Sequence, residues 1–378
     1  MSFKQLYFDV AATTPMDLTV AEIVHEANLE SFGNPSSMHM SGQKAHNIVE
    51  RSRNSIAEIL NCKPSEIIFT SGGSESNNIV LKGVLKKGDH LITSSYEHPS
   101  ILNLANHLEK NGIEVSFVKP KNNGSIDIKD IKSEIKENTK LISIMYVNNE
   151  LGTINPIKEI GDIAHKNKIL FHSDAVQFIG KENINLSILN IDFATICAHK
   201  FYGPKGIGAL YCKSGIIINP LIEGGGQEDG KRAGTENISS ILGMAKALEI
   251  SSDSFSKNKQ KILKLENYFL ELLDNSNIEY RLNGETRLTG ILNITFFGVE
   301  GHGLLMNLDM QGIAISYGSA CSSGSANAPQ ALIEIGMKEE EARCSVRISI
   351  GKMIIKKDIK QLFKSIENII NRIKPNER

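Results

Sequence analysis

From about residue 66 to residue 212, apolar runs alternate with amphipathic segments. The runs are short and rich in β-branched residues, which is typical of buried strands. They span residues 66–70, 90–95, 113–118, 140–147, 169–173, 193–198 and 206–212. Between them apolar residues recur with helical spacing, as at Ile101, Leu104, Ala105 and Leu108 on one face. Repeated strand–helix–strand units predict an α/β fold, with a mainly parallel sheet that helices cover on both faces.

The pattern changes after about residue 237. A long helical stretch at 238–273 contains the polar segment SSDSFSKNKQ, which we expect to join two helices or to kink one. Helices and further strand-like segments follow, with strands at 290–297, 313–316 and 346–350 and a last helix at 356–373. This order is typical of an α+β unit and predicts a second, smaller domain.

The chain length agrees with two domains, because 378 residues exceed the size of one ordinary domain. We expect a large domain at 13–250. We expect a small domain formed by 1–12 together with 251–378.

Composition and charge narrow the class of function. Hydrophobic residues make up 40% and charged residues 22%, so intrinsic disorder is excluded as the main state. Lys and Arg number 42 and Asp and Glu 43, which leaves a net charge of −1 and no broad basic field for nucleic acid or an anionic membrane. The longest apolar runs, such as 141–147, are too short to span a bilayer.

The N-terminal residues and the cysteines indicate the cellular compartment of the protein. The start MSFKQLYFDVAATTP has no long apolar stretch, so it is not a secretory signal. The 5 cysteines are an odd number with no CxxC pair, which argues against a disulfide framework and a zinc ribbon. We therefore expect a cytoplasmic protein.

Ligands of open α/β sheets bind at the carboxyl ends of strands, so we examine those ends for chemistry. The segment TSGGSES (70–76) follows a strand and opens a helix, where two glycines and free N–H groups favour a phosphate. It matches neither the P-loop nor the dinucleotide pattern, which argues against ATP, GTP and a dinucleotide. A purely structural glycine-rich turn is the alternative.

Two charged residues stand at the ends of apolar strands. Asp174 closes the run at 169–173, either as a helix cap or as a fixed carboxylate for a buried cation. Lys200 directly follows the run at 193–198. A buried lysine tends to lose its proton and then becomes a nucleophile suited to a Schiff base. The alternative is an exposed lysine at a strand exit.

A phosphate cradle, a carboxylate for a pyridinium nitrogen and a Schiff-base lysine are together what pyridoxal 5′-phosphate (PLP) requires. His98, which follows another strand, could stack on the cofactor ring or shuttle a proton, or it could be structural. Asn149 and Gln177 follow neighbouring strands and could donate hydrogen bonds to the phenolic oxygen of the cofactor.

Two further residues have chemical potential. Cys321 lies in SYGSACSSGSANAPQ (316–330), whose small and polar residues predict a mobile loop with an exposed, reactive thiol. The other cysteines lie in or beside apolar runs or in a helix, which favours structural roles. Arg347, in the strand VRISI, could bind a substrate carboxylate through its planar fork or form a plain surface salt bridge.

The sequence resembles a known family across most of its length. The motifs are YFDVAATTP, FGNPSSMH, FTSGGSESNN, EHPS, VNNELGTINPI, HSDAVQ, AHKFYGPKGIGALY, GGGQEDGKRAGTEN, GSACSSGS and VRISIG. In this order, from about residue 6 to residue 351, they are similar to the cysteine desulfurases of the class V aminotransferase superfamily. The NifS/IscS-like group, which supplies sulfur for iron–sulfur clusters, is the best match. The resemblance implies fold type I of the PLP-dependent transferases, the aspartate aminotransferase-like fold.

The resemblance also implies a role for each residue that matches a motif. Lys200 would bind PLP covalently, Asp174 would pair with the pyridinium nitrogen, and His98 would stack on the ring. Asn149 and Gln177 would contact the phenolic oxygen. The phosphate would be held by a further group of residues: Gly73, Ser74, His199 and, from the other subunit of a homodimer, Thr235.

For the substrate, the resemblance implies that Arg347, with Asn34 near the mouth of the pocket, holds the carboxylate. Cys321 would be the nucleophile that forms a persulfide. Two positions depart from the family pattern. Cys197 replaces a serine that contacts the phosphate, so PLP affinity is expected to be lower, and Tyr317 replaces a small residue, which is expected to alter the mobility of the cysteine loop.

The implied reaction converts L-cysteine to L-alanine and leaves the sulfur on Cys321. The acceptor would be an iron–sulfur scaffold protein, with which Cys321 could share a cluster as a metal ligand, or another thiolation partner. A selenocysteine lyase or an aminotransferase on the same fold is the alternative, and a non-catalytic relative is a further one. A cluster held by the cysteines of one chain is disfavoured, because their spacing lacks close thiolate groups.

Overall fold

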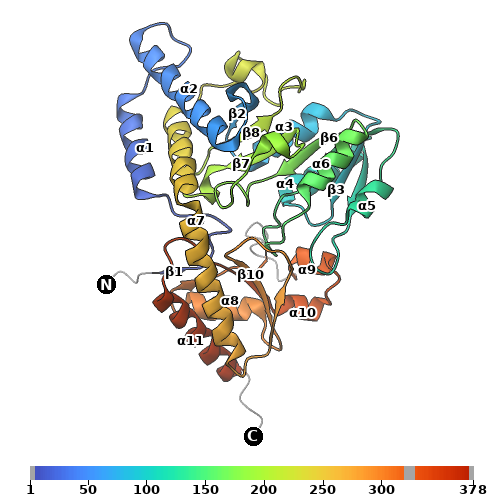
Figure 1. Cartoon of the computed structure of the whole chain (residues 1–378), viewed down its shortest axis with the longest axis vertical. Helices are drawn as coiled ribbons and strands as arrows, with labels where there is room; N and C mark the ends of the chain where they lie inside the picture. The colour runs from blue at the N-terminus through green and yellow to red at the C-terminus, as the bar shows by residue number, and fades with distance from the viewer. Residues whose placement is uncertain (1–4, 319–327, 374–378) are drawn as a thin grey trace.

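The computed structural model describes residues 5–318 and 328–373 of the chain. A seven-stranded sheet forms the centre of the upper part of the molecule (Figure 1). Its strand order is β2-β8-β7-β6-β5-β3-β4. The strands are β2 (Ile67–Thr70), β3 (His90–Ser94), β4 (Glu114–Val118), β5 (Thr139–Ser143), β6 (Leu170–Asp174), β7 (Phe193–Cys197) and β8 (Gly208–Cys212).

Within this sheet only β8 runs against its neighbours. It pairs antiparallel with β2 and β7, whereas β3–β4, β3–β5, β5–β6 and β6–β7 are parallel. The predicted α/β class with a mainly parallel sheet is therefore confirmed. The apolar run at 140–147 leaves the sheet earlier than predicted, because β5 ends at Ser143.

Helices cover both faces of this sheet, as predicted. Neighbouring strand residues enter different cores: Leu91 packs with α3 (Gly73–Val84) and α4 (Pro99–Lys110), whereas Ile92 packs on the opposite face. That opposite face carries α2 (Met40–Leu60), α5 (Ile128–Ser133), α6 (Ile157–Lys166) and the first part of α7 (Ile238–Asp274), with α1 (Leu18–Glu30) packed beside α7.

A second, smaller core surrounds a three-stranded antiparallel sheet of order β12-β10-β9. Its strands are β9 (Tyr280–Asn283), β10 (Ile291–Phe296) and β12 (Ser345–Ser349), and a separate parallel pair joins β1 (Leu6–Tyr7) to β11 (Ile313–Ala314). The helices of this part are α8 (Gly301–Asp309) and α11 (Lys356–Ile373), while α9 (Gln330–Glu334) and α10 (Glu339–Arg343) pack on the first core.

The structure corrects the break that was expected in the helical stretch at 238–273. This stretch belongs to α7, which is one continuous helix of 37 residues. Met244 and Leu248 pack in the first core, and Phe269 and Leu273 in the second. The polar segment 251–260 lies between these two contacts, where most of its side chains are exposed or part-buried. A helix that crosses between two cores needs a polar middle, so the polar residues do not interrupt it.

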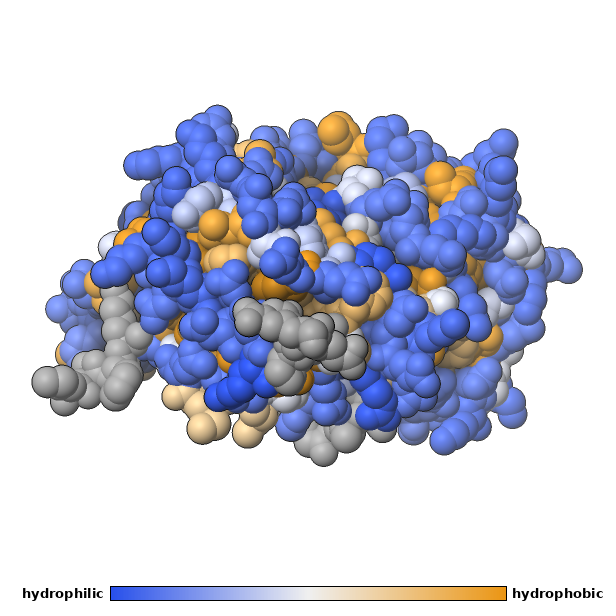
Figure 2. Space-filling model, turned by 90° about the horizontal axis from the view of Figure 1, so that it is seen from below, coloured by the Kyte–Doolittle hydropathy of each residue, from blue (hydrophilic) through white to orange (hydrophobic). Residues whose placement is uncertain are grey.

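The division of the chain at residues 12 and 250 stays a prediction, since α7 runs through residue 250 without a break. Among the described residues, no helix is both long enough and apolar enough to cross a membrane. Seen from the lower end of Figure 1, the surface is mainly hydrophilic and its hydrophobic residues lie in separate patches (Figure 2).

Candidate active site

A cavity of about 260 Å³ lies at the carboxyl ends of β6 and β7. Asp174 is the last residue of β6, and Lys200 closes the single 3-10 turn that follows β7. The cavity brings together these predicted site residues: Gly73, Ser74, His98, Asn149, Asp174, Gln177, Cys197, His199, Lys200 and Arg347. The crossover connections of a parallel sheet place distant motifs at one edge, as the sequence predicted.

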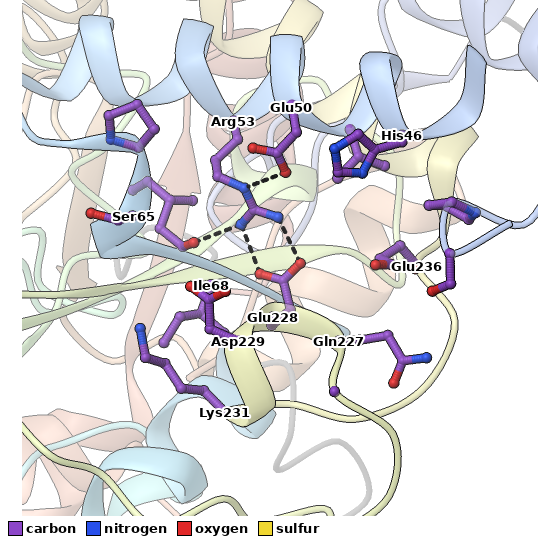
Figure 3. Close-up of a pocket in the computed structure, with 16 residues that line it drawn as sticks. His46, Glu50, Arg53, Ser65, Ile68, Gln227, Glu228, Asp229, Lys231 and Glu236 are labelled. Atoms are coloured by element: carbon purple, nitrogen blue, oxygen red, sulfur yellow. Dashed lines mark hydrogen bonds and ion pairs between the residues drawn. The ribbon is translucent and has the colours of Figure 1, made fainter. Parts of the chain in front are cut away.

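Three predicted residues are not part of this arrangement. Asn34 and Thr235 are exposed and do not line the cavity. Their chain neighbours Pro35 and Glu236 line a second cavity of about 750 Å³, shown in Figure 3. The predicted role of Thr235 concerns a second subunit and stays a prediction. Cys321 and the loop predicted around it lie outside the described residues.

The amine of Lys200 is held by the main chain. Its Nζ donates to the carbonyl oxygens of Ala11, at 2.8 Å, and Ala12, at 2.6 Å. Burial, and then the positive charge of Arg347, lower the pKa of Lys200 to about 8. An appreciable fraction of the amine is therefore neutral near neutral pH, as a nucleophile or base requires. The alternative of an exposed lysine is wrong.

A second lysine at this site was not identified from the sequence. Lys181 donates from Nζ to Oε1 of Gln177 at 2.6 Å, and Gln177 donates from Nε2 to the carbonyl oxygen of Ala11 at 2.7 Å. Burial, and then the charges of Lys200 and Arg347, lower the pKa of Lys181 to about 7. Lys181 and Lys200 both line a small cavity of about 60 Å³. No local signal marks Lys181, because it lies in a turn several residues after the end of β6, and the charges that lower its pKa, on Lys200 and Arg347, lie elsewhere in the chain.

The carboxylate of Asp174 is buried and bound by neutral donors. Its Oδ2 accepts a hydrogen bond from Nδ2 of Asn77 at 3.0 Å, and its Oδ1 accepts from the backbone N–H of Val176 at 3.1 Å. These donors orient the carboxylate without neutralising its charge, so the group can still attract a cationic nitrogen in the cavity. The helix-cap alternative is wrong, because the residues that the structure describes directly after β6 form turns and no helix, and the Val176 contact belongs to a local turn.

His98 is oriented by the start of α4. It is the N-cap residue, and its Nδ1 accepts from the backbone N–H of Ser100 at 3.1 Å, with Oγ of Ser100 at 2.8 Å. Burial lowers the pKa of His98, and the charge of Asp174 opposes that effect. The pKa shift and the cap together favour a neutral ring in one orientation.

The glycine-rich turn is the end of the cavity that could hold a phosphate. Gly72 has φ of 151°, in the region that glycine favours, and offers no side chain to cap α3. A Cβ at Gly73 would lie 3.2 Å from Cγ2 of Val176, so the turn is closely packed. The N-terminus of α3 thus has no N-cap side chain, and Gly73 and Ser74 at its start line the cavity, which is an arrangement that can bind an anion.

The two departures from the family pattern are both in the described residues. Sγ of Cys197 donates to the carbonyl oxygen of Ile207 at 3.8 Å, and burial raises the pKa of this thiol. The ring of Tyr317 meets the ring of His302 edge to face, with 6.0 Å between centroids. Tyr317 thus contacts α8, while its predicted effect on the loop that follows lies outside the described residues.

Arg347 is an internal residue, so the alternative of a surface salt bridge is wrong. Its side chain is 1% exposed and donates to Oδ1 of Asp9 and to the carbonyl oxygen of Asn149, each at 2.7 Å. Its Nε is buried and has no hydrogen-bond partner among the described residues. Leaving a buried donor unsatisfied costs free energy, so this atom is an exception among the buried polar groups of the described residues. Arg347 itself lines the cavity.

Comparisons with known proteins cover nearly the whole chain. The family described as Aminotransferase class-V matches residues 6–362. The chain is 42% identical over 377 residues to a protein of Dictyoglomus turgidum named cysteine desulfurase IscS, which covers 98% of this chain and 96% of that relative.

Solved structures agree with this relation. A structure titled NifS-like protein is 35% identical, with a TM-score of 0.91, and the match covers 97% of this chain and 100% of that one. A structure titled SspA in complex with cysteine is 38% identical, with a TM-score of 0.82 and coverage of 92% and 99%.

Proposed function

Because the chain belongs to the class-V aminotransferase family and matches cysteine desulfurases along nearly its whole length, we infer that it is a cysteine desulfurase. It takes sulfur from L-cysteine and leaves L-alanine. The observation that carries this assignment is the convergence of Lys200, Asp174 and Arg347 on one cavity of about 260 Å³. An amine, a carboxylate and a carboxylate-binding guanidinium are the groups that PLP chemistry on an amino acid requires.

The residues of the cavity fit PLP. A neutral amine at Lys200, an anion at Asp174 and an uncapped helix N-terminus at Gly73 match the aldehyde, the pyridine nitrogen and the phosphate of the cofactor. When bound, PLP withdraws electrons from an attached amino acid and so weakens the bond between Cβ and sulfur.

The cofactor would be held by residues on every side of the cavity. Lys200 would bind it covalently, and Asp174 would keep a proton on its pyridine nitrogen. His98 would stack on the ring, while Asn149 and Gln177 would donate to the phenolic oxygen. The phosphate would be held by the following group: Gly73, Ser74, His199 and Thr235 of a second copy of this chain. The thiol of Cys197 already donates to a main-chain carbonyl, which supports a lower affinity for PLP.

The substrate would be held and deprotonated by two basic residues. The carboxylate of L-cysteine would accept hydrogen bonds from the guanidinium of Arg347, which lines the cavity. Asn34 is proposed to assist from the pocket mouth. The neutral amine of Lys200 would take the proton from Cα, since its lowered pKa makes it a base near neutral pH.

Sulfur would leave through Cys321. Its thiolate would attack the sulfur of the substrate, so that a sulfur–sulfur bond forms as the carbon–sulfur bond breaks. The electron pair stays with the substrate carbon, which takes up protons and leaves as alanine. Ser316 exchanges two main-chain hydrogen bonds with Arg347, at 2.8 and 3.0 Å. Cys321 follows Ser316 by five residues in the sequence.

The later fate of the sulfur is also part of the proposal. A scaffold protein for iron–sulfur clusters, or another thiolation partner, would accept it, and Cys321 could share a cluster with that scaffold. Among residues 5–318 and 328–373, no group of three or more His, Cys, Asp or Glu could hold a metal ion. The homodimer and the location in the cytoplasm stay predictions.

The decisive experiment measures alanine and sulfide together from L-cysteine, with and without PLP. We expect equal amounts of both products from the wild type with PLP and a reductant. Lys200→Ala should bind PLP without a covalent bond and give neither product. Cys321→Ala should keep the colour of bound PLP and form no persulfide. The matched controls Lys140→Ala, at the one exposed position of β5, and Cys344→Ala, at a part-exposed cysteine, should behave like the wild type.

Three results would contradict the proposal. Turnover by Lys200→Ala at the wild-type rate would remove Lys200 from the chemistry. Release of a keto acid in place of alanine would favour the aminotransferase alternative, and a marked preference for selenocysteine would favour the lyase.

A further inference from the structure

Asn77 occupies the centre of a hydrogen-bond network behind the candidate active site. It lies in α3, is 0% exposed, and was not assigned a role by the sequence motifs. Its side chain contacts three groups: Oδ2 of Asp174 at 3.0 Å, Oγ of Ser100 at 2.8 Å and Oγ1 of Thr195 at 2.7 Å. All contacts are short enough to be full hydrogen bonds.

The orientation of the Asn77 amide follows from its partners. A carboxylate oxygen can only accept, so Nδ2 of Asn77 must face Asp174. Its second hydrogen then goes to Oγ of Ser100. The remaining amide atom, Oδ1, accepts from the hydroxyl of Thr195. Nδ2 therefore donates two hydrogen bonds and Oδ1 accepts one, and this pattern fits only one of the two possible orientations of the amide.

Ser100 transmits this orientation to His98. Because Oγ of Ser100 accepts from Asn77, its own hydrogen is available for Nδ1 of His98 at 2.8 Å. The backbone N–H of Ser100 also points at Nδ1, at 3.1 Å. Two donors facing one ring nitrogen make that nitrogen an acceptor, so the proton of the neutral ring is on Nε2.

The chain of hydrogen bonds keeps the same donor-to-acceptor direction on the other side of Asn77. The Thr195 hydroxyl donates to Asn77, so it accepts from Nε2 of His172 at 3.0 Å. Nδ1 of His172 then accepts from Oγ of Ser143 at 2.8 Å. Burial lowers the pKa of His172 to about 4, so the ring is neutral and can take part in this way. The hydrogen bonds thus run in one direction from Ser143 to His98.

We propose that Asn77 is a positioning residue for the reaction. Its single amide group orients the carboxylate of Asp174 and, through the hydroxyl of Ser100, adds to the backbone N–H of Ser100 in keeping the proton of His98 on Nε2. The inference rests on the proposed function, because Asp174 and His98 face the cofactor cavity. Asparagine suits the position for a chemical reason. Leucine could make none of these bonds, and aspartate would place a second carboxylate against Asp174.

The test uses the full-length chain labelled with ¹⁵N-histidine, with His98 assigned by its absence in His98→Gln. In the wild type without PLP, the ¹⁵N shifts should show His98 as one tautomer with the proton on Nε2. Asn77→Leu, of similar volume, frees the Ser100 hydroxyl to turn away from His98 but leaves the backbone N–H of Ser100 at Nδ1. A detectable minority of rings should therefore carry the proton on Nδ1, while the Nε2 tautomer remains the main form. Asn77→Leu should also lower PLP affinity about tenfold, since one hydrogen bond to a buried carboxylate is lost. The control Asn78→Ala removes only a bond to the main chain of its own helix and should change neither value.

Ser100→Ala separates the two effects and covers the case in which Asn77→Leu does not fold. It removes the hydroxyl link to His98 and leaves Asn77 bound to Asp174 and the backbone N–H of residue 100 at Nδ1. A minority of rings should therefore carry the proton on Nδ1, while PLP affinity stays within about twofold, less than a single lost hydrogen bond. A proton on Nδ1 of His98 in the wild type would overturn the proposal, as would an unchanged tautomer ratio in both folded variants. The tautomer is read without PLP or L-cysteine, so it decides this inference even if desulfurase activity were absent.

Discussion

At the scale of single residues, the site depends on charged groups that the fold has removed from water. Lys200 and Arg347 lie close enough for the guanidinium to lower the pKa of the amine. Asp9 and the carbonyl oxygen of Asn149 hold the guanidinium in place. A buried ion pair of this kind contributes little net stability, but it presents a rigid donor to a ligand.

Substitution of Arg347 by lysine should therefore affect binding more than chemistry. Arg347→Lys keeps the positive charge and loses the planar fork that a carboxylate recognises. We expect KM for L-cysteine to rise about tenfold or more, as for the loss of a charge-assisted hydrogen bond, with a smaller change in kcat. Steady-state kinetics of alanine formation give both values. The matched control is Arg343→Lys, at the exposed end of α10, and an unchanged KM for Arg347→Lys would contradict the assignment.

Glu97 gives a prediction of pH dependence. It is 4% exposed, and burial raises its pKa from the ordinary value to about 8. Between pH 4.5 and 8 the folded chain keeps a proton that the unfolded chain releases. The contribution of Glu97 to stability is therefore fully present below pH 4.5 and is lost as the pH rises toward 8.

Glu97→Gln cannot ionise, so its melting temperature relative to the wild type should rise between pH 5 and pH 8. The change corresponds to about 1 kcal/mol or more, since each pH unit in that range is worth up to about 1.4 kcal/mol. Thermal unfolding at both pH values measures it, with exposed Glu109→Gln as the control. An equal difference at both pH values would show that Glu97 is ionised in the folded chain.

At the scale of elements, the short 3-10 segment η4 (Gln227–Gly230) depends on one internal ion pair. Glu228 and Asp229 both have positive φ, at 50° and 54°, which is unfavourable for residues with a side chain. The carboxylate of Glu228 accepts from both terminal nitrogens of Arg53, each at 2.8 Å (Figure 3). It also accepts from the backbone N–H of Phe69 at 2.8 Å. One carboxylate thus joins η4 to α2 and β2.

Breaking this pair should loosen the segment that contains Thr235. Arg53→Met leaves the Glu228 carboxylate buried with its charge unpaired, which costs about 3 kcal/mol. We expect faster hydrogen exchange in a peptide covering residues 223–237, and weaker PLP binding if Thr235 contributes to the phosphate site. The double variant Arg53→Met with Glu228→Met should recover part of the stability.

The control for this experiment is Lys158→Met, which breaks an ion pair on the surface of α6. It should leave exchange in residues 223–237 unchanged, because exposed pairs contribute about 0–1 kcal/mol. Exchange in Arg53→Met as slow as in the wild type would mean that the backbone of η4 does not depend on this pair.

At the scale of the whole molecule, an exposed apolar surface extends along the end of α1 and the start of α2. We call it the α1–α2 surface, and its residues are Leu29, Phe32, Met38 and Met40, exposed by 66, 79, 92 and 86%. Single exposed apolar residues are common, but several in one short segment are typical of a protein interface. Asn34 lies in this segment, which supports the proposed homodimer.

We expect Phe32→Asp to weaken self-association, because a charge in an apolar interface loses its hydration. Sedimentation velocity should show a shift from dimer to monomer at micromolar concentration. PLP affinity should fall in the same variant if Thr235 of a second copy binds the phosphate. Met310→Asp changes an 85% exposed methionine next to α8 and serves as the control. A wild-type monomer that binds PLP tightly would contradict both the dimer and the shared site.

The local pattern of the sequence was sufficient for most elements and for the class of the fold. Strand and helix periods depend on which side chains face a core, and this information is present in each short window. The buried face of α4 is one example, since Ile101, Leu104, Ala105 and Leu108 are all buried as predicted. The polar segment within α7 was misleading, because a helix that packs in two cores does not need an apolar stripe between them.

For the site, the sequence was sufficient to identify the residues at the strand ends, and the tertiary structure decided how they are held. Lys200 and Asp174 are recognisable because charged residues at the ends of apolar strands are unusual. Lys181 and Asn77 carry no such signal, since their importance comes from contacts with residues far away in the chain. Hydrogen-bond direction, burial and pKa depend on neighbours that only the folded chain brings together, and for that reason no local pattern could predict them.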